Sequence, residues 1–282
     1  MENDGILIID KPVGLTSRAI DNRIGHLFSS RHVGHLGTLD PFASGMLIIG
    51  VNKGNKALTY IDDSKKTYRA TLVLGKKTDS GDLTGIIIEE KEVPFLDKAK
   101  IEDTLSSFLG ESTQIPPMRS AIKINGEALY KKAIRGEDIE RKPRDITVYS
   151  IKLLDYEDNR ITFETEVSRG TYIRTLGEDI ASKLGSVGYL ESLRRLSIND
   201  IKEEEMVKLD DIDVSSLRNP LPYISLKKVE IDKATYQKVL NGVRLSFPLK
   251  DERILLVYED KPISVYIKTE EEGVYKAERG LF

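Results

Sequence analysis

The sequence predicts an α/β (α+β) fold, in which a mixed, largely antiparallel sheet is flanked by helices and followed by a small C-terminal module similar to a β-barrel. Strand-like and helix-like segments follow each other irregularly, which favours a mixed sheet over a doubly wound parallel one. After one last helix-like segment, the end of the chain contains only short strand-like runs. The 282 residues are 39% apolar and 32% charged, so the chain can bury a sizeable core.

The first elements follow from apolar runs and turn residues. A strand is predicted over 5–10, because this run stops at a Pro- and Gly-containing turn over 11–14. Thr16 or Ser17 can cap the next helix, and apolar residues at helical spacing predict its buried side, namely Ile20, Ile24, Leu27 and Phe28. A strand over 46–51 and a helix over 56–61 come next. Strands over 69–74 and 85–90 are expected to form a hairpin around the turn-rich residues 77–82.

Later elements are predicted in the same way. A helix over 98–109 ends at Gly110, and a short strand over 120–124 precedes a helix over 127–135. Strands are predicted over 146–154 and 160–167, the second with one buried face made of Ile161, Phe163, Thr165 and Val167. A helix over 172–184 stops at Gly185, and another covers 233–240. The last strands are predicted over 254–258, 263–267 and 274–277.

A domain boundary is predicted within 217–222, where two prolines interrupt a polar stretch. The larger domain would span 1–222 and the smaller one 223–282. Because a unit of this size is marginally stable alone, we expect it to pack against the larger domain.

Composition excludes several functional classes. Without cysteine, the chain has no disulfide framework, no thiolate nucleophile and no Cys-ligated zinc. No apolar run approaches the roughly 18 residues that span a bilayer, so no membrane partner is expected. The first residues lack the basic region of a signal peptide, and we expect a cytoplasmic protein.

The net charge of −3 argues weakly against a nucleic-acid partner. This excess comes from residues 251–282, which hold five basic and eight acidic side chains. Basic residues gather in one earlier stretch, at Lys131, Lys132, Arg135, Arg141, Lys142 and Arg144. The stretch is either a basic binding face or the solvated surface of a helix.

Common cofactor and metal motifs fail on inspection. The run Gly75-Lys76-Lys77-Thr78 lacks the earlier glycine of a phosphate-binding loop. The acids of 79–82 lack the alternating oxygen ligands of a calcium loop, and the three histidines at 26, 32 and 35 have no completing carboxylate pattern. We therefore expect neither a metal nor an organic cofactor.

The most informative segment is the glycine-rich loop from Gly34 to Leu47, with Asp40 at its centre. Its glycines allow the backbone to approach a ligand closely, and Pro41 stiffens the chain directly after the carboxylate. Such an aspartate is either a positioned catalytic group or a turn residue.

Five segments then occur in a characteristic order. They are Lys11–Ser17, Gly34–Leu47, Lys66–Arg69 with Thr78-Asp79, Pro116–Gly126, and Arg169–Thr175 with Leu193–Leu196. Together they resemble the bacterial tRNA pseudouridine-55 synthases of the TruB family, which isomerise the T-loop uridine of tRNA. The resemblance covers most of residues 5–200, and Gly-His-x-Gly-Thr-Leu-Asp-Pro is its most specific motif. It implies a pseudouridine synthase fold and a PUA-type C-terminal module that binds RNA.

The resemblance also implies residue roles. Asp40 would be the catalytic aspartate, Tyr68 the tyrosine against the target base and Arg174 the basic partner of the aspartate. His35 would help displace the flipped nucleotide. The remaining implied support and substrate contacts are Lys11 and Pro12 below the catalytic loop, Leu193 or Leu196 along the uracil pocket, Tyr172, and Lys131, Lys132, Arg141 and Arg144 in an RNA-gripping insertion over about 114–145.

The implied reaction breaks the uracil N1–C1′ bond, turns the base and joins C5 to C1′. It needs no oxidant or energy source, which agrees with the missing cofactor motifs. Asp40 could attack C1′, stabilise an oxocarbenium-like centre or remove a C2′ proton, and the sequence leaves these routes open. All three need a carboxylate, and Arg174 is expected to bind it bidentately and to keep its pKa low.

Two other functional classes stay open. One is an RNA-binding or RNA-folding module without catalysis, and the other is a glycoside hydrolase, for which no second carboxyl group is evident near Asp40. Arg119 and Ile134 replace the Tyr and Arg usual in relatives, and neither is expected to touch the chemistry. The implied partner is the T-arm of tRNA, bound by a monomer.

Overall fold

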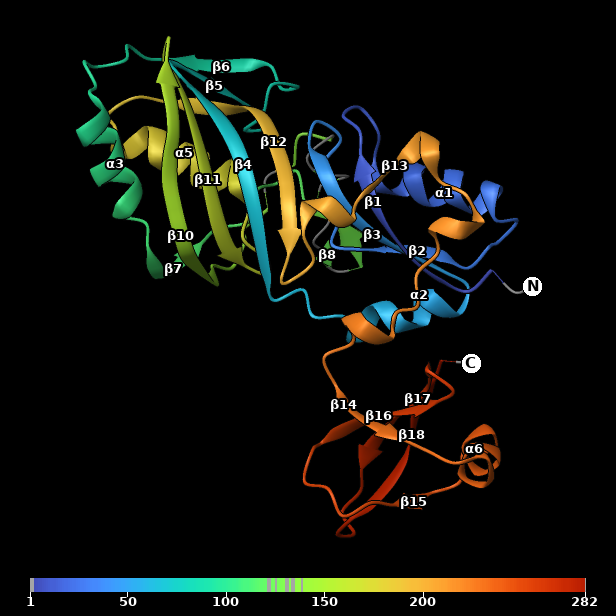
Figure 1. Cartoon of the computed structure of the whole chain (residues 1–282). Helices are drawn as coiled ribbons and strands as arrows, with labels where there is room; N and C mark the ends of the chain where they lie inside the picture. Colours follow the sequence, from blue (N-terminus) through green and yellow to red (C-terminus); the bar gives the residue numbers. More distant parts are fainter. Residues whose placement is uncertain are drawn as a thin grey trace.

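The computed structural model describes residues 3–120, 123–124, 126–129, 132, 135–137 and 139–281. Its main feature is a nine-stranded sheet with the order β13-β1-β3-β12-β4-β11-β10-β7, in which β2 also pairs with β3 (Figure 1). The strands are β1 (Gly5–Lys11), β2 (Val33–Leu36), β3 (Ser44–Val51), β4 (Lys65–Leu74), β7 (Gly110–Gln114), β10 (Arg144–Glu157), β11 (Arg160–Ser168), β12 (Gly188–Ile198) and β13 (Val207–Lys208). Most neighbours are antiparallel, and the parallel pairs are β1 with β13 and β3 with β12.

Helices cover this sheet in two groups. α3 (Lys98–Ser106) and α5 (Ile173–Lys183) contact each other and the half of the sheet that contains β4, β10 and β12 (Figure 1). α1 (Ser17–Leu27) packs Ile20 and Ile24 against β1 and β3, while the short α2 (Lys53–Ala57) follows β3. The predicted mixed α/β class with a largely antiparallel sheet is therefore confirmed.

The end of the chain forms a second sheet with the order β14-β16-β17-β18-β15. Its strands are β14 (Lys227–Glu230), β15 (Leu245–Ser246), β16 (Arg253–Tyr258), β17 (Lys261–Lys268) and β18 (Val274–Gly280), and α6 (Lys233–Leu240) lies beside them (Figure 1). Leu255, Val257 and Val265 of this sheet share one apolar cluster with Ile6 and Ile48 of the main sheet. The module therefore packs against the body through a continuous core.

Several local predictions hold. Thr16 caps α1 by accepting a hydrogen bond from the Ala19 backbone N–H at 3.0 Å. The alternating face of β11 is buried, with Ile161, Phe163, Thr165 and Val167 at most 1% exposed. Both features depend only on neighbours in the sequence.

Other local predictions differ from the structure. The helix predicted over 56–61 starts earlier, as α2 over Lys53–Ala57, and continues as a 3₁₀ helix over Leu58–Tyr60. β6 (Ile87–Glu90) pairs with β5 (Lys76–Thr78) rather than with β4, which is already flanked by β11 and β12. Leu27 is 54% exposed, because the apolar stripe of α1 is narrower than predicted.

Several strands have no predicted counterpart, and β12 and β7 are the longest of them. β12 contains register shifts between Leu190 and Ser192 and between Arg195 and Ser197, and these bulges break the alternation that marks a strand. β7 is a polar edge strand with four exposed residues.

The region after Ser120 agrees in part. β8 (Lys123–Ile124) lies within the predicted strand over 120–124 and pairs with β9 (Glu127–Ala128), which takes the place of the first residues of the predicted helix over 127–135. Leu129 and Lys132 of that helix are helical. Residues 121–122, Lys131 and Ile134 lie outside the described residues. Within the described part of the chain, no helix combines the length and apolarity needed to cross a membrane.

Candidate active site

A pocket of about 320 Å³ lies where the two halves of the main sheet meet, beside the parallel pairing of β3 with β12. Its volume is at the lower end of the range for small-ligand sites, roughly 300–1,000 Å³. The predicted residues that line it are Asp40, Tyr68, Tyr172, Arg174 and Leu193. Segments far apart in the sequence thus converge on one cavity.

The loop that carries Asp40 is hydrogen-bonded to Ser17, the first residue of α1. The Ser17 hydroxyl donates to the Leu39 carbonyl at 3.0 Å and accepts from the Leu39 N–H at 2.9 Å. The Gly14 N–H donates to the Pro41 carbonyl at 2.7 Å. These bonds cross-link the loop to the segment after β1, so the carboxylate is borne on a fixed backbone.

Arg195 is a residue of this site that the sequence analysis missed. Its side chain is 1% exposed, and its guanidinium donates to the carbonyls of Met46 (2.7 Å) and Gly37 (2.8 Å). Gly45 lies against its backbone, since a Cβ at Gly45 would be 2.2 Å from the Arg195 carbonyl oxygen. The signal in the sequence was the pair of glycines around Asp40, which permit this close approach.

Asp40 and Arg174 form the central ion pair. Arg174 Nε lies 2.9 Å from Asp40 Oδ2, and the Arg174 side chain is 4% exposed. The Asp40 side chain keeps 36% of its surface, because it faces the pocket. The contact uses one guanidinium nitrogen, so the prediction of a bidentate pair is wrong.

The pKa of Asp40 is raised above its usual value of 3.8. Burial at the base of the pocket is the largest cause, and the nearby charge of Asp82 acts in the same direction. Arg174 and, more weakly, Lys11 oppose the shift. The prediction that Arg174 keeps this pKa low is therefore wrong, since desolvation outweighs the attraction.

The other nitrogens of Arg174 are occupied by protein groups. Nη1 donates to the Ser80 carbonyl at 2.7 Å and lies 3.7 Å from Asp82 Oδ2, and Nη2 donates to the Arg119 carbonyl at 2.7 Å. Arg119 thus does touch the residues of the site, contrary to expectation. Asp82 is a second carboxyl group near Asp40, which the sequence analysis did not find.

Lys11 is the last residue of β1, and the exposed Pro12 follows it. Lys11 has no exposed surface, and its ammonium donates to the carbonyls of Pro12 (2.8 Å) and Leu15 (2.7 Å). Burial lowers the pKa of Lys11 to about 8, although the charge of Asp40 opposes this shift. That the two residues support the catalytic loop stays a prediction.

His35 lies at the edge of the same loop. Its Nδ1 is 2.9 Å from Asp21 Oδ2, and its Nε2 is 3.0 Å from Thr38 Oγ1. Since a carboxylate only accepts, Nδ1 carries the proton in this bond. Leu196 is buried but, unlike Leu193, does not line the pocket.

The predicted basic stretch is partly neutralised. Lys132 lies 3.9 Å from acidic groups on Glu127 and Glu137, and Arg141 donates to the carbonyls of Ile139 and Pro116. Arg144 is exposed at the start of β10. Lys131 lies outside the described residues.

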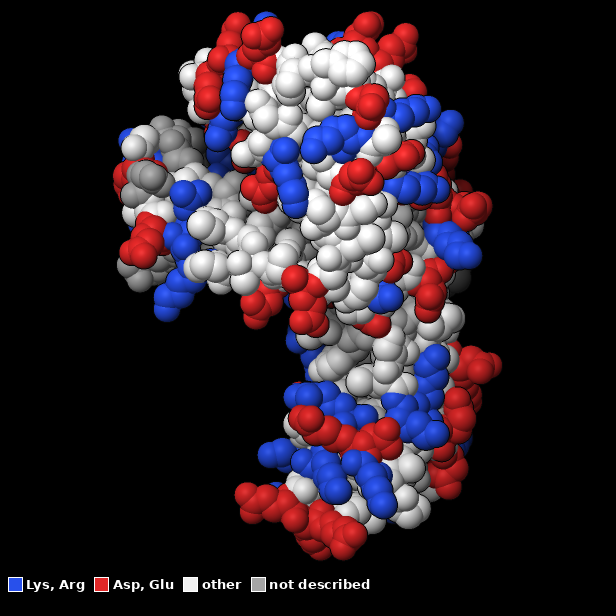
Figure 2. Space-filling view, turned by 90° about the vertical axis from the view of Figure 1, so that its left-hand side faces the viewer, with Lys and Arg blue, Asp and Glu red and all other residues white. Residues whose placement is uncertain are grey.

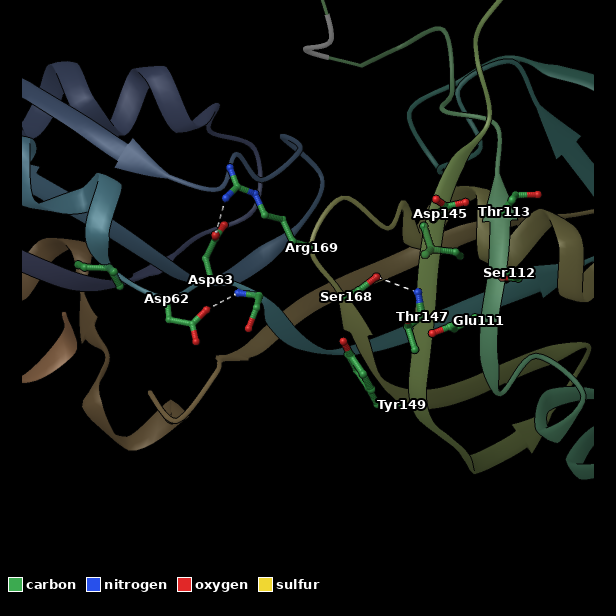
Figure 3. A pocket seen from close by; sticks show the side chains of 13 residues that line it. Asp62, Asp63, Glu111, Ser112, Thr113, Asp145, Thr147, Tyr149, Ser168 and Arg169 are labelled. Atoms are coloured by element: carbon green, nitrogen blue, oxygen red, sulfur yellow. Dashed lines mark hydrogen bonds and ion pairs between the residues drawn. The ribbon is translucent and has the colours of Figure 1, made fainter. Parts of the chain in front are cut away.

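A second hollow of about 800 Å³ adjoins the Asp40 pocket and shares Asp63, Ser168 and Arg169 with it. Figure 3 shows the carboxylates of Asp62, Asp63, Glu111 and Asp145 around it. Asp63 is bound by Arg169 (3.1 Å) and by the buried ammonium of Lys66 (3.0 Å). These acids disfavour a phosphate in the hollow. No cluster of three or more potential metal ligands occurs among the described residues.

Comparisons with known proteins agree on one family. Residues 25–173 match the model of the TruB family pseudouridylate synthase N-terminal domain. The chain is 39% identical over 278 residues to tRNA pseudouridine synthase B of Clostridium kluyveri, covering 94% of this chain and 92% of that protein. It is 40% identical over 268 residues to the protein of the same name from Aquifex aeolicus, with 91% and 92% covered.

Solved structures share the fold. A chain in a crystal structure of a Cbf5-Nop10-Gar1 complex matches 99% of this chain and 85% of its own length, with a TM-score of 0.73 at 24% identity. A chain from the structure of an H/ACA RNP bound to a substrate RNA containing 2′-deoxyuridine matches with a TM-score of 0.72 at 21% identity, covering 100% of this chain and 86% of that one.

Proposed function

Because the chain belongs to the TruB family of pseudouridylate synthases, we propose that it isomerises the T-loop uridine at position 55 of tRNA, with Asp40 as its catalytic aspartate. As a tRNA pseudouridine synthase it is an isomerase with an RNA substrate. The site of modification, the residue roles and base flipping are the parts that we propose.

One observation carries the assignment of the site. Asp40 is the carboxylate at the base of the pocket, paired at 2.9 Å with the buried Arg174. Tyr68, 7% exposed, and Leu193, also 7% exposed, present apolar surface to the same cavity. A carboxylate between a fixed cation and an aromatic wall suits a reaction at an anomeric carbon beside a bound base.

Asp40 acts in its ionised form in this proposal. It attacks C1′, stabilises an oxocarbenium-like centre or removes a C2′ proton while the N1–C1′ bond breaks. The base then turns and its C5 joins C1′. A raised pKa implies that the ionised fraction, and with it the rate, falls at a higher pH than for an ordinary aspartate.

The target uridine is stacked inside the folded T-loop, so we propose that it flips into the pocket, at a cost of a few kcal/mol. Tyr68 receives the base against its ring, and Leu193 limits the other side. His35, anchored through Asp21, takes part at the mouth of the loop where the nucleotide leaves its stack. Tyr172 begins α5 at the rim of the pocket.

RNA contacts outside the pocket are proposed for two regions. The first is the insertion over about 114–145, with Lys131, Lys132, Arg141 and Arg144. The second is the PUA-like module over 223–282, beyond a catalytic domain over 1–222. Figure 2 shows Lys and Arg side chains on the near side of this module, interspersed with acidic ones, and an indentation between it and the body. We propose that a monomer holds the T-arm along this side, in the cytoplasm.

The second carboxyl group does not favour a hydrolase. Asp82 accepts from the Ser80 hydroxyl and the Thr84 N–H at 2.9 Å each, and its other oxygen faces Arg174. Asp82 is thus directed at protein groups and does not line the pocket, so it is not placed to protonate a leaving group.

The test uses an unmodified tRNA transcript labelled with tritium at uracil C5. Wild-type protein should release tritium from the T-loop uridine without added metal or nucleotide, and Asp40→Asn should release none while binding tRNA normally. Asp155→Asn, an exposed aspartate on β10, is the matched control and should keep full activity. Near-normal turnover by Asp40→Asn would refute the assignment, and free uracil would indicate hydrolysis.

A further inference from the structure

The guanidinium of Arg174 belongs to a cycle of contacts that also includes Ser80, Asp79 and Arg119. Its Nη1 donates to the carbonyl of Ser80 and its Nη2 to the carbonyl of Arg119. Asp79, the neighbour of Ser80, forms an ion pair with the side chain of Arg119. The two carbonyls that hold Arg174 are therefore linked to each other by one salt bridge.

The Asp79 side of this ring is rigid. Asp79 Oδ1 accepts from the Ile86 N–H at 3.0 Å, and the Asp79 N–H donates to the Ile86 carbonyl at 3.1 Å. Inside the turn, Asp82 Oδ1 accepts from the Ser80 hydroxyl at 2.9 Å. Gly85 packs closely against the Asp79 side chain, since a Cβ at Gly85 would lie 2.5 Å from Asp79 Oδ1.

The Arg119 side has fewer supports of its own. Arg119 follows Pro116 and Pro117 at the start of the 114–145 insertion, and its side chain is 45% exposed. Residues 115–120 lie outside helices and strands, so neither a helix nor a sheet holds the backbone of Arg119 in place. The ion pair with Asp79 ties the Arg119 side chain to the rigid turn.

We infer that Arg119 is a positioning residue for the isomerisation: its ion pair with Asp79 sets the two carbonyls that hold both Nη atoms of Arg174, leaving Nε directed at Asp40. This inference rests on the proposed roles of Asp40 and Arg174. It also joins the insertion, which is proposed to grip RNA, to the reacting carboxylate through two residues.

The position matters because an ion pair of one nitrogen with one oxygen is sensitive to rotation of the guanidinium. If the Arg119 carbonyl moves away, Nη2 loses its acceptor, and the guanidinium can turn toward Asp82, which lies 3.7 Å from Nη1. Asp40 would then still be repelled by the charge of Asp82, while its attraction to the Arg174 guanidinium would weaken. Misplacement of a catalytic pair by about 1 Å can cost roughly a hundredfold in rate.

The experiment compares Arg119→Met, Asp79→Asn and their double variant with wild type. Asp79→Asn removes the charge but keeps an Oδ1 acceptor for the Ile86 N–H. Arg135→Met is the matched control, because Arg135 is 47% exposed and ion-paired with Glu127 and Glu137 in the same insertion, away from Arg174. Arg119→Lys restores the charge and tests rescue.

Single-turnover rates on unmodified tRNA, tRNA dissociation constants and thermal melting are measured for each variant. Arg119→Met and Asp79→Asn should each lose roughly tenfold or more in rate, the double variant should lose no more than the worse single one, and Arg119→Lys should recover part of the loss. Binding should weaken no more than for Arg135→Met.

The pH profile separates positioning from general destabilisation. Since Arg174 lowers the pKa of Asp40 while Asp82 raises it, the acid limb of the rate should move to higher pH in Arg119→Met and stay in place in Arg135→Met. A wild-type rate for Arg119→Met would overturn the inference, and so would a rate loss with lowered melting temperature and an unmoved acid limb. Inactivity of wild type, or activity of Asp40→Asn, would instead refute the proposed function.

Discussion

Lys11 offers a sharp test of the electrostatics below the catalytic loop. Its side chain has no exposed surface, and its ammonium is held by two backbone carbonyls rather than by a carboxylate among the described residues. Replacing Lys11 by Met removes the buried charge and keeps a chain of similar length. The pH dependence of the resulting stability difference follows from the shifted pKa.

The magnitude and sign can be worked out. The pKa of Lys11 is about 8 in the folded protein, against 10.5 for an unperturbed lysine. At about 1.4 kcal/mol per pKa unit, the difference corresponds to about 3 kcal/mol. Between these two values the unfolded state binds more protons, so the folded state gains stability as the pH rises. The penalty of burying the charge is fully present below pH 8 and is relieved toward pH 10.5.

The assay is urea unfolding of wild type and Lys11→Met at a series of pH values from 7 to 10. The free energy of unfolding of wild type minus that of the variant cancels the contributions of other titrating groups and should rise by about 2.5 kcal/mol between pH 7 and pH 10. Lys152→Met, whose lysine is 66% exposed, is the control and should give a flat difference. A flat or falling difference for Lys11→Met would show that this ammonium is not desolvated.

Two further predictions concern the backbone and the imidazole beside Asp40. Gly45→Ala should lower the free energy of unfolding far more than Gly14→Ala. Both glycines have a φ above +90°, so both variants carry backbone strain of about 1–2 kcal/mol. Only a Cβ at Gly45 would also clash with the Arg195 carbonyl, at 2.2 Å, because nothing lies within 4 Å of a Cβ at Gly14. Denaturant unfolding measures both variants, and equal losses would contradict the clash. Asp21→Leu should release Nδ1 of His35 from its 2.9 Å bond, so that ¹⁵N NMR shifts from the Nδ1–H tautomer toward Nε2–H; an unchanged tautomer would show that Asp21 does not hold the ring.

The sequence by itself determined the fold class, the family and the residues around which the pocket forms. Local patterns sufficed for α1 and β11, because a cap and an alternating face depend on near neighbours. The motif resemblance was enough to select Asp40, Tyr68 and Arg174, which the structure brings to one cavity. It was not enough for β12, whose bulges hide its alternation.

The tertiary structure alone decided how these groups are charged and held. Whether Arg174 grips Asp40 with one nitrogen or two depends on the carbonyls of Ser80 and Arg119, which come from segments about 40 residues apart. The raised pKa of Asp40 likewise depends on how much water the assembled pocket removes and on the position of Asp82, because desolvation and Coulomb energies are set by distances in space. The spacing of these residues along the chain does not predict those distances.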